Sequence, residues 1–305
     1  MADEELPWAQ PDWLAEVRAW INERTVVTGE IEQPHVRPWS TALRIPTADG
    51  TLWFKAVAET QWFEPGLTRL LATVRPDPVT ELVDVDEERG WMLMRDAGTR
   101  LREAPPTVEH FECVLPRYAE LQLAAASHAE RMVELGVPDV RLPAFLRSVE
   151  ALAADYPELA LRLPEVEALV AQLAAAGIPE SVQHDDLHDG QIFVKDGHYR
   201  VLDWGDSCVS HPFHSLTVTL RAAAWKLGLK PGSPELLRMR NAYLEPFGPP
   251  PQLAELAGIA YRTGTLGRAL AYQRYLATRA PLDEEDPVPY NVGLFVENGP
   301  IGTWE

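Results

Sequence analysis

The chain has 305 residues, of which 46% are hydrophobic and 24% are charged, as is typical of a globular protein with one large or two modest domains. The formal net charge of −19 argues against a nucleic-acid partner, because phosphate contacts need clustered Lys and Arg, and is compatible with a cationic substrate. Two cysteines provide no disulfide framework, and no signal sequence or apolar run of about twenty residues is visible, so we expect a cytoplasmic protein without membrane contact.

The N-terminal third alternates between helical and extended patterns. Apolar residues recur at helical spacing over 12–23 and again over 62–74. Extended patterns separate and follow these helices, at 26–32, 40–45, 51–58, 79–85 and 91–94. Short turns join neighbouring runs, as in a meander. We therefore predict a small antiparallel sheet with helices packed on it.

Lys55 lies in the third extended run and is the first of four lysines in the chain. The alternation of side chains along a strand places Lys55 on one face with Trp53, and Leu52 with Phe54 on the other. A lysine on a strand can extend from an edge into solvent, or it can contact an anionic ligand.

From about residue 105 onward the pattern is helical. A long helix is predicted from 107 to 135, ending at Gly136. Further helices are predicted at 143–154, 165–175, 214–227, 234–244, 251–263 and 266–278. The second part of the chain is therefore mainly helical, and no partner segment is evident, so a monomer or weak dimer is the default expectation.

One stretch, at 183–207, interrupts the helices. Within it, Asp186 is followed five residues later by Gln191 and twelve residues after that by Asp203. Two apolar runs, at 192–194 and 199–202, flank an Asp-Gly pair, which is a hairpin signal. A hairpin brings its two ends together, so these three side chains can converge on one point. Such a convergence suits a metal-bound phosphate held beside a base.

This stretch resembles the catalytic core of the aminoglycoside phosphotransferase and choline kinase family, which has a protein-kinase-like fold. The family's catalytic loop reads H-G-D-x-H-x-x-N and its metal-binding loop reads I-D-W/F-E/G, and the matching segments here are HDDLHDGQ at 184–191 and LDWG at 202–205. The resemblance implies that Asp186 orients and deprotonates a substrate hydroxyl, while Gln191 and Asp203 hold Mg²⁺. Two residues depart from the pattern, because Asp185 replaces a small residue and Gln191 replaces Asn.

The resemblance also implies roles for residues of the N-terminal part. Lys55 would contact the nucleotide phosphates, and Glu64 at the start of the helix 62–74 would pair with it, with Glu59 as the competing partner. A carboxylate at a helix start is also stabilised by the helix dipole, so Glu64 could serve only as a cap.

A glycine-rich phosphate loop is absent, and 33–40 occupies its place, so the resemblance implies Ser40 and Thr41 as candidate phosphate contacts. The segment 92–98 leaves the sheet where the family has its hinge, whose backbone amide and carbonyl bind the adenine edge, which implies that Met94 and Asp96 belong to the nucleotide site. An ordinary crossover between the lobes is the alternative, and in either case the segment marks the domain boundary.

Together these features predict an α+β protein with a protein-kinase-like two-lobe fold, a small antiparallel sheet at 1–96 that binds nucleotide, and a helical catalytic and substrate-binding lobe at 97–305. The implied function is ATP·Mg²⁺-dependent transfer of the γ-phosphate to a hydroxyl of a small molecule, such as an aminoglycoside, amino sugar, sugar or amino alcohol. ATP and GTP are not distinguished.

Two alternatives remain open at this point. Gln191, in place of a usual metal ligand, is compatible with a catalytically silent nucleotide-binding protein. The cluster of His184 and His188 with Asp185, Asp186 and Asp189 is compatible with a metal-dependent hydrolase.

Overall fold

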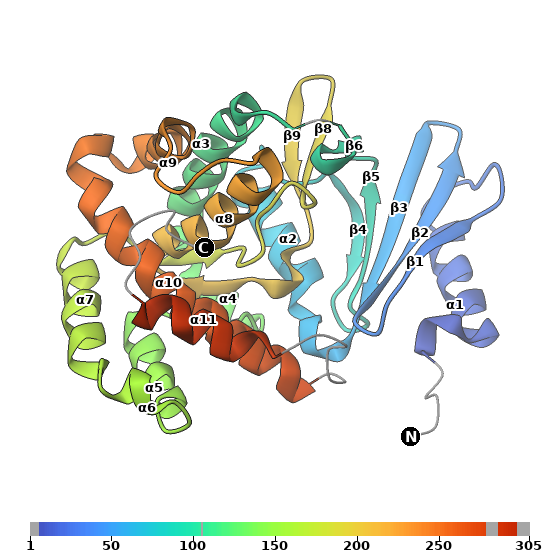
Figure 1. Ribbon diagram of the computed structural model, residues 1–305. Coiled ribbons are helices and arrows are strands. Elements are labelled where there is room, and N and C mark those ends of the chain that lie inside the picture. Colours follow the sequence, from blue (N-terminus) through green and yellow to red (C-terminus); the bar gives the residue numbers. More distant parts are fainter. Residues whose placement is uncertain (1–5, 105, 279–285, 298–305) are drawn as a thin grey trace.

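A computed structural model of the chain describes residues 6–104, 106–278 and 286–297. Its N-terminal part contains a five-stranded antiparallel sheet with the strand order β1-β2-β3-β5-β4. The strands are β1 (Glu32–Val36), β2 (Ser40–Thr47), β3 (Gly50–Val57), β4 (Leu82–Asp86) and β5 (Trp91–Arg95). This sheet lies beside a mainly helical part (Figure 1), which confirms the predicted α+β architecture.

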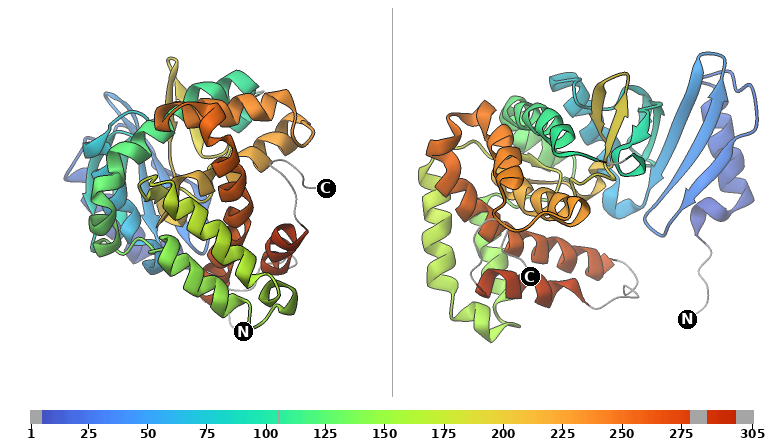
Figure 2. Two further views of the ribbon diagram at one scale, coloured as in Figure 1. Left: turned by 90° about the vertical axis from the view of Figure 1, so that its left-hand side faces the viewer. Right: turned by 45° about the horizontal axis from the view of Figure 1, so that its top comes forward.

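Helix α1 (Pro11–Asn22) covers the face of the sheet that points away from the helical part (Figure 2). Its buried Trp20 packs edge-on against two aromatic rings of the sheet, with centroids 5.7 Å from Phe54 and 5.9 Å from Trp91. Such aromatic contacts add to the free energy gained by burying the rings. Apolar side chains therefore fill this face, and the other face of β3 is available for polar groups.

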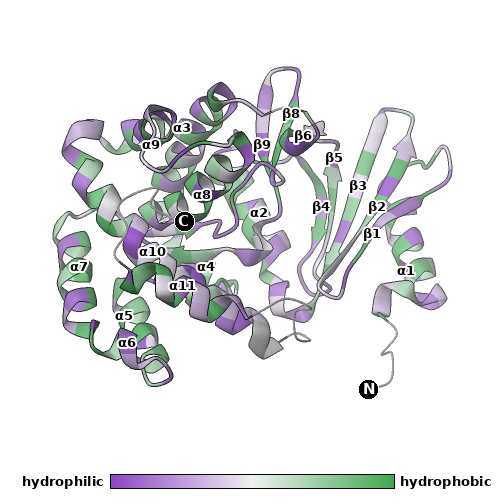
Figure 3. Ribbon diagram, viewed as in Figure 1, coloured by the Kyte–Doolittle hydropathy of each residue, from purple (hydrophilic) through white to green (hydrophobic). Residues whose placement is uncertain are grey.

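The predicted alternation along β3 is confirmed. Phe54 is fully buried beneath α1, whereas Lys55 lies on the opposite face, between Ala42 of β2 and Met92 of β5. The alternating colours along β2 and β3 in Figure 3 show the same pattern. Because β3 is a central strand, Lys55 cannot extend into solvent from a sheet edge.

The predicted strand at 26–32 is wrong. Only Val27 forms an isolated bridge, to Thr47, and the first strand is β1 at Glu32–Val36. The neighbouring position of β2 is Pro46, which has no N–H to donate, so the hydrogen-bond ladder on this side of β2 is incomplete. The segment 33–40 consequently forms most of β1 and the turn that leads into Ser40.

Helix α2 (Phe63–Val74) lies between the sheet and the helical part (Figure 1). Leu67 and Leu71 are fully buried in the large hydrophobic core of the helical part. Glu64, in the first turn, is also buried, with 1% of its surface exposed. The helix thus connects the sheet to the rest of the molecule and carries a carboxylate into the interior.

The helical part contains α3 (Val108–Ala125), α4 (Ala129–Glu134), α5 (Leu142–Leu152), α6 (Pro157–Ala160), α7 (Leu163–Ala175), α8 (Ser215–Leu227), α9 (Pro234–Leu244), α10 (Pro250–Thr278) and α11 (Pro287–Val296). The single helix predicted from 107 to 135 is wrong, because a 3₁₀ turn at Ala126–His128 separates α3 from α4. Over three residues the apolar spacing of the two helix types differs little, so periodicity does not reveal the break. Helix α11 was not predicted.

Helix α10 is continuous, so the prediction of two separate helices, at 251–263 and 266–278, is wrong. Gly264 lies between the two predicted ranges. This glycine marks a close contact instead, because a Cβ at position 264 would lie 2.2 Å from Oγ1 of Thr217 on α8. The absence of a side chain thus lets two helices approach each other without interrupting either one. None of the helices in the described ranges has the length and hydrophobicity needed to cross a membrane.

The predicted hairpin between Gln191 and Asp203 is confirmed. Strand β8 (Ile192–Lys195) pairs antiparallel with β9 (His198–Val201), and β6 (Thr99–Arg100) adds a third strand. The backbone N–H of Leu202 donates to the carbonyl of Gln191 at 3.0 Å, which closes the base of the hairpin. A second pair, β7 (Ser181–Gln183) with β10 (Cys208–Ser210), flanks the two loops that carry Asp186 and Asp203.

Candidate active site

The carboxylate of Asp186 accepts hydrogen bonds from three side chains. Nη2 of Arg268 lies 2.9 Å from its Oδ1, while Nε2 of Gln191 and Nε2 of His188 lie 3.3 Å and 3.2 Å from its Oδ2. Burial would raise the pKa of Asp186, but the hydrogen bond from His188 and the positive charge of Arg268 outweigh it and hold the pKa below its usual range. Asp186 is therefore an ionised carboxylate in a mostly enclosed site.

The contacts of His188 determine its tautomer. The backbone N–H of Gly190 and Nη2 of Arg102 both lie 2.9 Å from Nδ1, so Nδ1 is the acceptor and Nε2 carries the proton that is donated to Asp186. A Cβ at position 190 would lie 2.0 Å from the Arg102 guanidinium, so only glycine permits this approach. The motif assigns His188 no role of this kind, and Arg102 lies outside the motif.

Lys55 joins three elements of the structure. Its Nζ lies 2.6 Å from Oε1 of Glu64 on α2 and 2.5 Å from Oδ1 of Asp203 in the loop after β9. Burial would lower the pKa of Lys55, but the charges of Asp203 and Glu64 raise it, so the ammonium stays charged. Glu59 lies in the short 3₁₀ helix that precedes α2, so Glu64 is the residue that pairs with Lys55.

Asp203 adopts a left-handed backbone conformation, with φ 69° and ψ 54°. Such angles are uncommon outside glycine and occur chiefly for short polar residues. They turn the chain sharply where β9 ends, so that the half-exposed carboxylate faces Lys55. Asp185 has a similar φ of 62°, and its buried side chain accepts a hydrogen bond from Nε2 of Gln183 at 3.0 Å.

A cavity of about 500 Å³ lies between the sheet and the helical part. It is lined by seven of the eight predicted site residues, namely Ser40, Lys55, Glu64, Met94, Asp96, Gln191 and Asp203. The eighth, Asp186, is not among the lining residues but contacts Gln191 at its wall. The structure thus brings together side chains that are as far apart in sequence as Ser40 and Asp203.

Three of these residues lie on the sheet side of the cavity. Oγ of Ser40 lies 3.2 Å from Nε2 of His35, and the side chain of Met94 is buried. The carboxylate of Asp96 accepts hydrogen bonds from Nε1 of Trp53 at 3.1 Å and from Nζ of Lys195 at 3.2 Å. Because the Asp96 carboxylate is already paired, its contribution to the cavity is to order the chain where the sheet ends.

The donor atoms at the cavity suit a hard divalent cation. Asp203 supplies carboxylate oxygen, and Gln191 presents an amide whose nitrogen is directed to Asp186, leaving the amide oxygen for a metal. Oxygen ligands of this kind are those that Mg²⁺ prefers.

The histidines do not form a metal site with the neighbouring acids. Nε2 of His184 lies 2.8 Å from the carbonyl oxygen of Leu202, and His188 donates to Asp186. Within the described ranges, no group of three or more His, Cys, Asp or Glu side chains is placed to hold a metal ion. The geometry therefore gives no support to the hydrolase alternative.

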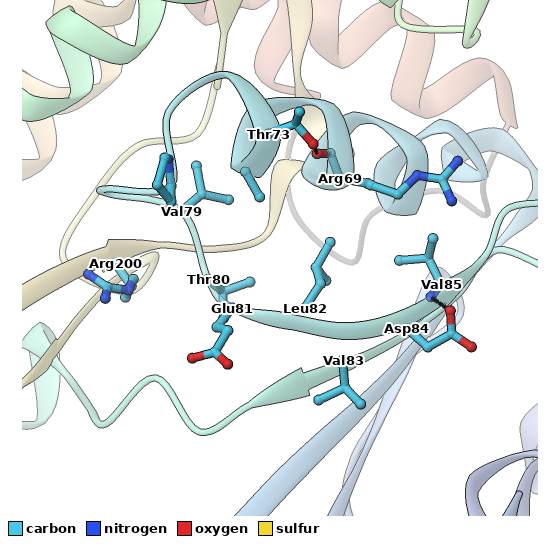
Figure 4. A pocket seen from close by; sticks show the side chains of 12 residues that line it. Arg69, Thr73, Val79, Thr80, Glu81, Leu82, Val83, Asp84, Val85 and Arg200 are labelled. Carbon is cyan, nitrogen blue, oxygen red and sulfur yellow. Dashed lines mark hydrogen bonds between the residues drawn. The ribbon is translucent and has the colours of Figure 1, made fainter. Parts of the chain in front are cut away.

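A second cavity, of about 590 Å³, lies between α2 and β4 (Figure 4). Its lining shares Thr80 with the first cavity and includes neither Lys55 nor Asp203. Its two arginines are engaged elsewhere, Arg69 with Glu87 and Arg200 with Asp77. The acidic and basic groups described above thus converge on the first cavity and not on the second.

Searches of solved structures find the same fold in proteins of low sequence identity. The choline kinase of Streptococcus pneumoniae aligns with a TM-score of 0.62 at 14% identity, over 94% of this chain and 100% of that chain. A choline/ethanolamine kinase family protein from Mesorhizobium loti aligns with a TM-score of 0.61 at 17% identity, over 93% and 92%. Amicoumacin kinase, solved in complex with AMP-PNP, Ca²⁺ and Ami, aligns with a TM-score of 0.59 at 11% identity, over 97% and 96%.

Identities this low establish the protein-kinase-like fold and nothing finer. No curated protein sequence matches the chain at a significant level. A family model described as the phosphotransferase enzyme family matches residues 52–256, which include Lys55, Glu64, Asp186 and Asp203. Since that match spans about two thirds of the sequence, the chain belongs to the phosphotransferase enzyme family.

Proposed function

We propose that this phosphotransferase is an ATP·Mg²⁺-dependent small-molecule kinase that transfers the γ-phosphate to a hydroxyl group. The observation that carries the proposal is the convergence of Lys55, Asp203 and Gln191 on one cavity, with Asp186 in contact with Gln191. Residues 1–96 would form the nucleotide-binding lobe and 97–305 the catalytic and acceptor-binding lobe. An aminoglycoside, amino sugar, sugar or amino alcohol would suit as acceptor.

Each residue has a role that its surroundings support. Lys55, oriented by Glu64, would offset the charge of the nucleotide phosphates. Asp203 and Gln191 would hold Mg²⁺, which when bound neutralises charge that develops on the phosphate oxygens. Asp186, ionised and held by three donors, would accept the proton of the acceptor hydroxyl.

The nucleotide would lie along the sheet side of the cavity. Ser40 at the start of β2 would face the phosphates, and Met94 at the end of β5 would lie against the base. Asp96 would act through the backbone that it orders, because its carboxylate is bound to Trp53 and Lys195.

Thermal unfolding tests the proposal directly. The melting temperature would be compared in buffer, with Mg²⁺, with ATP, and with both, for the unmodified chain and for Asp203→Asn. A ligand at 100 times its Kd stabilises a protein by about 2.7 kcal/mol. For a chain of this length, each kcal/mol raises the melting temperature by at most about 2–4 °C. We expect a shift that needs both Mg²⁺ and ATP and that Asp203→Asn abolishes.

Asp196→Asn is a matched control, because Asp196 also has a positive φ, of 51°, but lies in the hairpin turn between β8 and β9. It should retain the full shift. If no purine nucleotide shifts the unmodified chain, the kinase proposal is wrong. If ATP·Mg²⁺ binds but no hydroxylated amine or sugar is phosphorylated in a broad screen, the chain is better described as a silent nucleotide-binding protein.

A further inference from the structure

Arg268 makes a two-point contact with the loop that carries Asp186. Its Nη1 donates to the backbone carbonyl of Asp185 at 2.8 Å, and its Nη2 donates to Oδ1 of Asp186 at 2.9 Å. The guanidinium also lies over the ring of Tyr272, one helical turn along α10, at 4.5 Å from the centroid. The Arg268 side chain is only 14% exposed, and its contacts with Asp185, Asp186 and Tyr272 restrict its orientation. This contact joins α10 to the catalytic loop.

The hydrogen bonds of Asp186 define where a further donor can bind. A carboxylate has about four acceptor positions, two on each oxygen. Gln191 and His188 both donate to Oδ2, whereas Oδ1 accepts from Arg268. Among the donors that the described ranges provide, two therefore share Oδ2 and one occupies Oδ1, so the remaining acceptor position lies on Oδ1, beside the guanidinium. An acceptor hydroxyl that donates its proton to Asp186 would bind there, next to Arg268.

We infer that Arg268 is a positioning residue, which fixes the plane of the Asp186 carboxylate and directs its free acceptor position toward the incoming hydroxyl. This inference rests on the proposed kinase function and names a residue that the family motif does not contain. The planar guanidinium suits the role, because two parallel N–H groups bind the carbonyl and the carboxylate at once, which a lysine ammonium cannot reproduce with the same geometry.

Arg262 provides a matched control on the same helix. Its side chain is 12% exposed, close to the value for Arg268, and it is bonded to Glu165 of α7 at 2.6 Å and to the carbonyl of Phe295 on α11 at 3.3 Å. It has the same side chain and nearly the same exposure, but its hydrogen-bond partners lie on α7 and α11 instead of the loop that carries Asp186. Loss of packing or charge in α10 would affect variants at both positions, whereas loss of positioning would affect only those at 268.

The test compares Arg268→Lys, Arg268→Gln, Arg262→Lys and Arg262→Gln in the full chain, with ATP·Mg²⁺ and either a screened acceptor or water as phosphoryl acceptor. We expect kcat to fall by about 10²-fold in Arg268→Gln, with Arg268→Lys intermediate, because small displacements of a catalytic group have effects of this size. KM for ATP should stay within twofold of the value for the unmodified chain.

The Arg262 variants should have a lower melting temperature than the unmodified chain but the same kcat. For Arg268→Ala, added guanidinium chloride at millimolar concentration should restore part of kcat.

Two results would overturn the inference: a kcat of Arg268→Gln within threefold of the unmodified chain, or an equal loss in Arg262→Gln. Failure of the proposed function looks different, since the unmodified chain would then transfer phosphate to no acceptor. In that case the contact itself is still decided by melting temperatures of Arg268→Gln, Asp186→Asn and the double variant. A double variant that melts only as low as the worse single variant supports the orienting contact, and strictly additive losses refute it.

Discussion

The side-chain amide of Gln191 donates a hydrogen bond to Oδ2 of Asp186, at 3.3 Å. Gln191 stands where the family motif has Asn, and its additional methylene group lets the amide reach the carboxylate. With the nitrogen directed to Asp186, the amide oxygen remains for a cation. The substitution thus joins the proposed metal ligand to the proposed base, and it does not by itself imply loss of catalysis.

Asp186→Asn should abolish most turnover while leaving nucleotide binding intact. The amide keeps the shape of the carboxylate but cannot accept the hydroxyl proton, and a general base typically contributes about 10²- to 10⁴-fold to the rate. Product formation gives kcat, and calorimetric titration with ATP·Mg²⁺ gives the Kd. An unchanged kcat would show that Asp186 is not the base. Loss of ATP·Mg²⁺ binding in the titration would indicate a structural role instead.

Lys55→Met should destabilise the fold as well as weaken nucleotide binding. Glu64 is 1% exposed and would lose its cation, and removal of one partner from a buried ion pair costs about 3–5 kcal/mol. Urea unfolding measures the loss. Lys195→Met is the control, because Lys195 is half-exposed and its pair with Asp96 should contribute at most about 1 kcal/mol. Equal losses in the two variants would contradict the importance of the buried pair.

Asp185→Asn should stabilise the protein at neutral and alkaline pH. Burial raises the pKa of Asp185 to about 7, against the nearby charges of Arg268 and Arg274. The folded state therefore holds a proton that the unfolded state releases near pH 4, so stability is lost as pH rises from about 4 to about 7. The asparagine variant does not lose stability in this way. Its free energy of unfolding, relative to that of the unmodified chain, should increase by about 3–4 kcal/mol between pH 4 and 7 and stay constant at higher pH. Urea unfolding at pH 4.5, 6 and 8 checks this; a constant difference would contradict it.

His214→Gln should flatten the response to acid. Burial lowers the pKa of His214 to about 4, and its ring is bonded to Ser210 at 3.0 Å and Thr263 at 3.1 Å. The unfolded state takes up a proton near pH 6.5 that the folded state does not, so stability falls between about pH 6.5 and 4, by about 3 kcal/mol. The glutamine variant should be less stable at pH 7 but lose less on acidification. Parallel pH profiles of the two proteins would show that His214 does not contribute.

Local sequence pattern determined the elements and most of the site. Alternation along 51–58 placed Lys55 opposite the apolar face of β3, and the Asp-Gly turn predicted the hairpin that brings Gln191 to Asp203. These features depend on hydrogen bonds between neighbours in sequence, and their periods can be read directly from the residues. The resemblance in motif then indicated which carboxylates to expect in one place.

The tertiary structure alone decided which distant side chains meet. Arg268 contacts Asp186 across 82 positions of sequence, and Arg102 contacts His188 across 86. Neither arginine stands out, because the chain has 27 Lys and Arg residues and nothing local distinguishes these two. The two helices predicted at 251–263 and 266–278 are one helix for the same reason, since the contact that Gly264 permits with Thr217 is not visible in the local sequence. Periodicity specifies what a segment forms, whereas its neighbours are selected by packing over the whole chain.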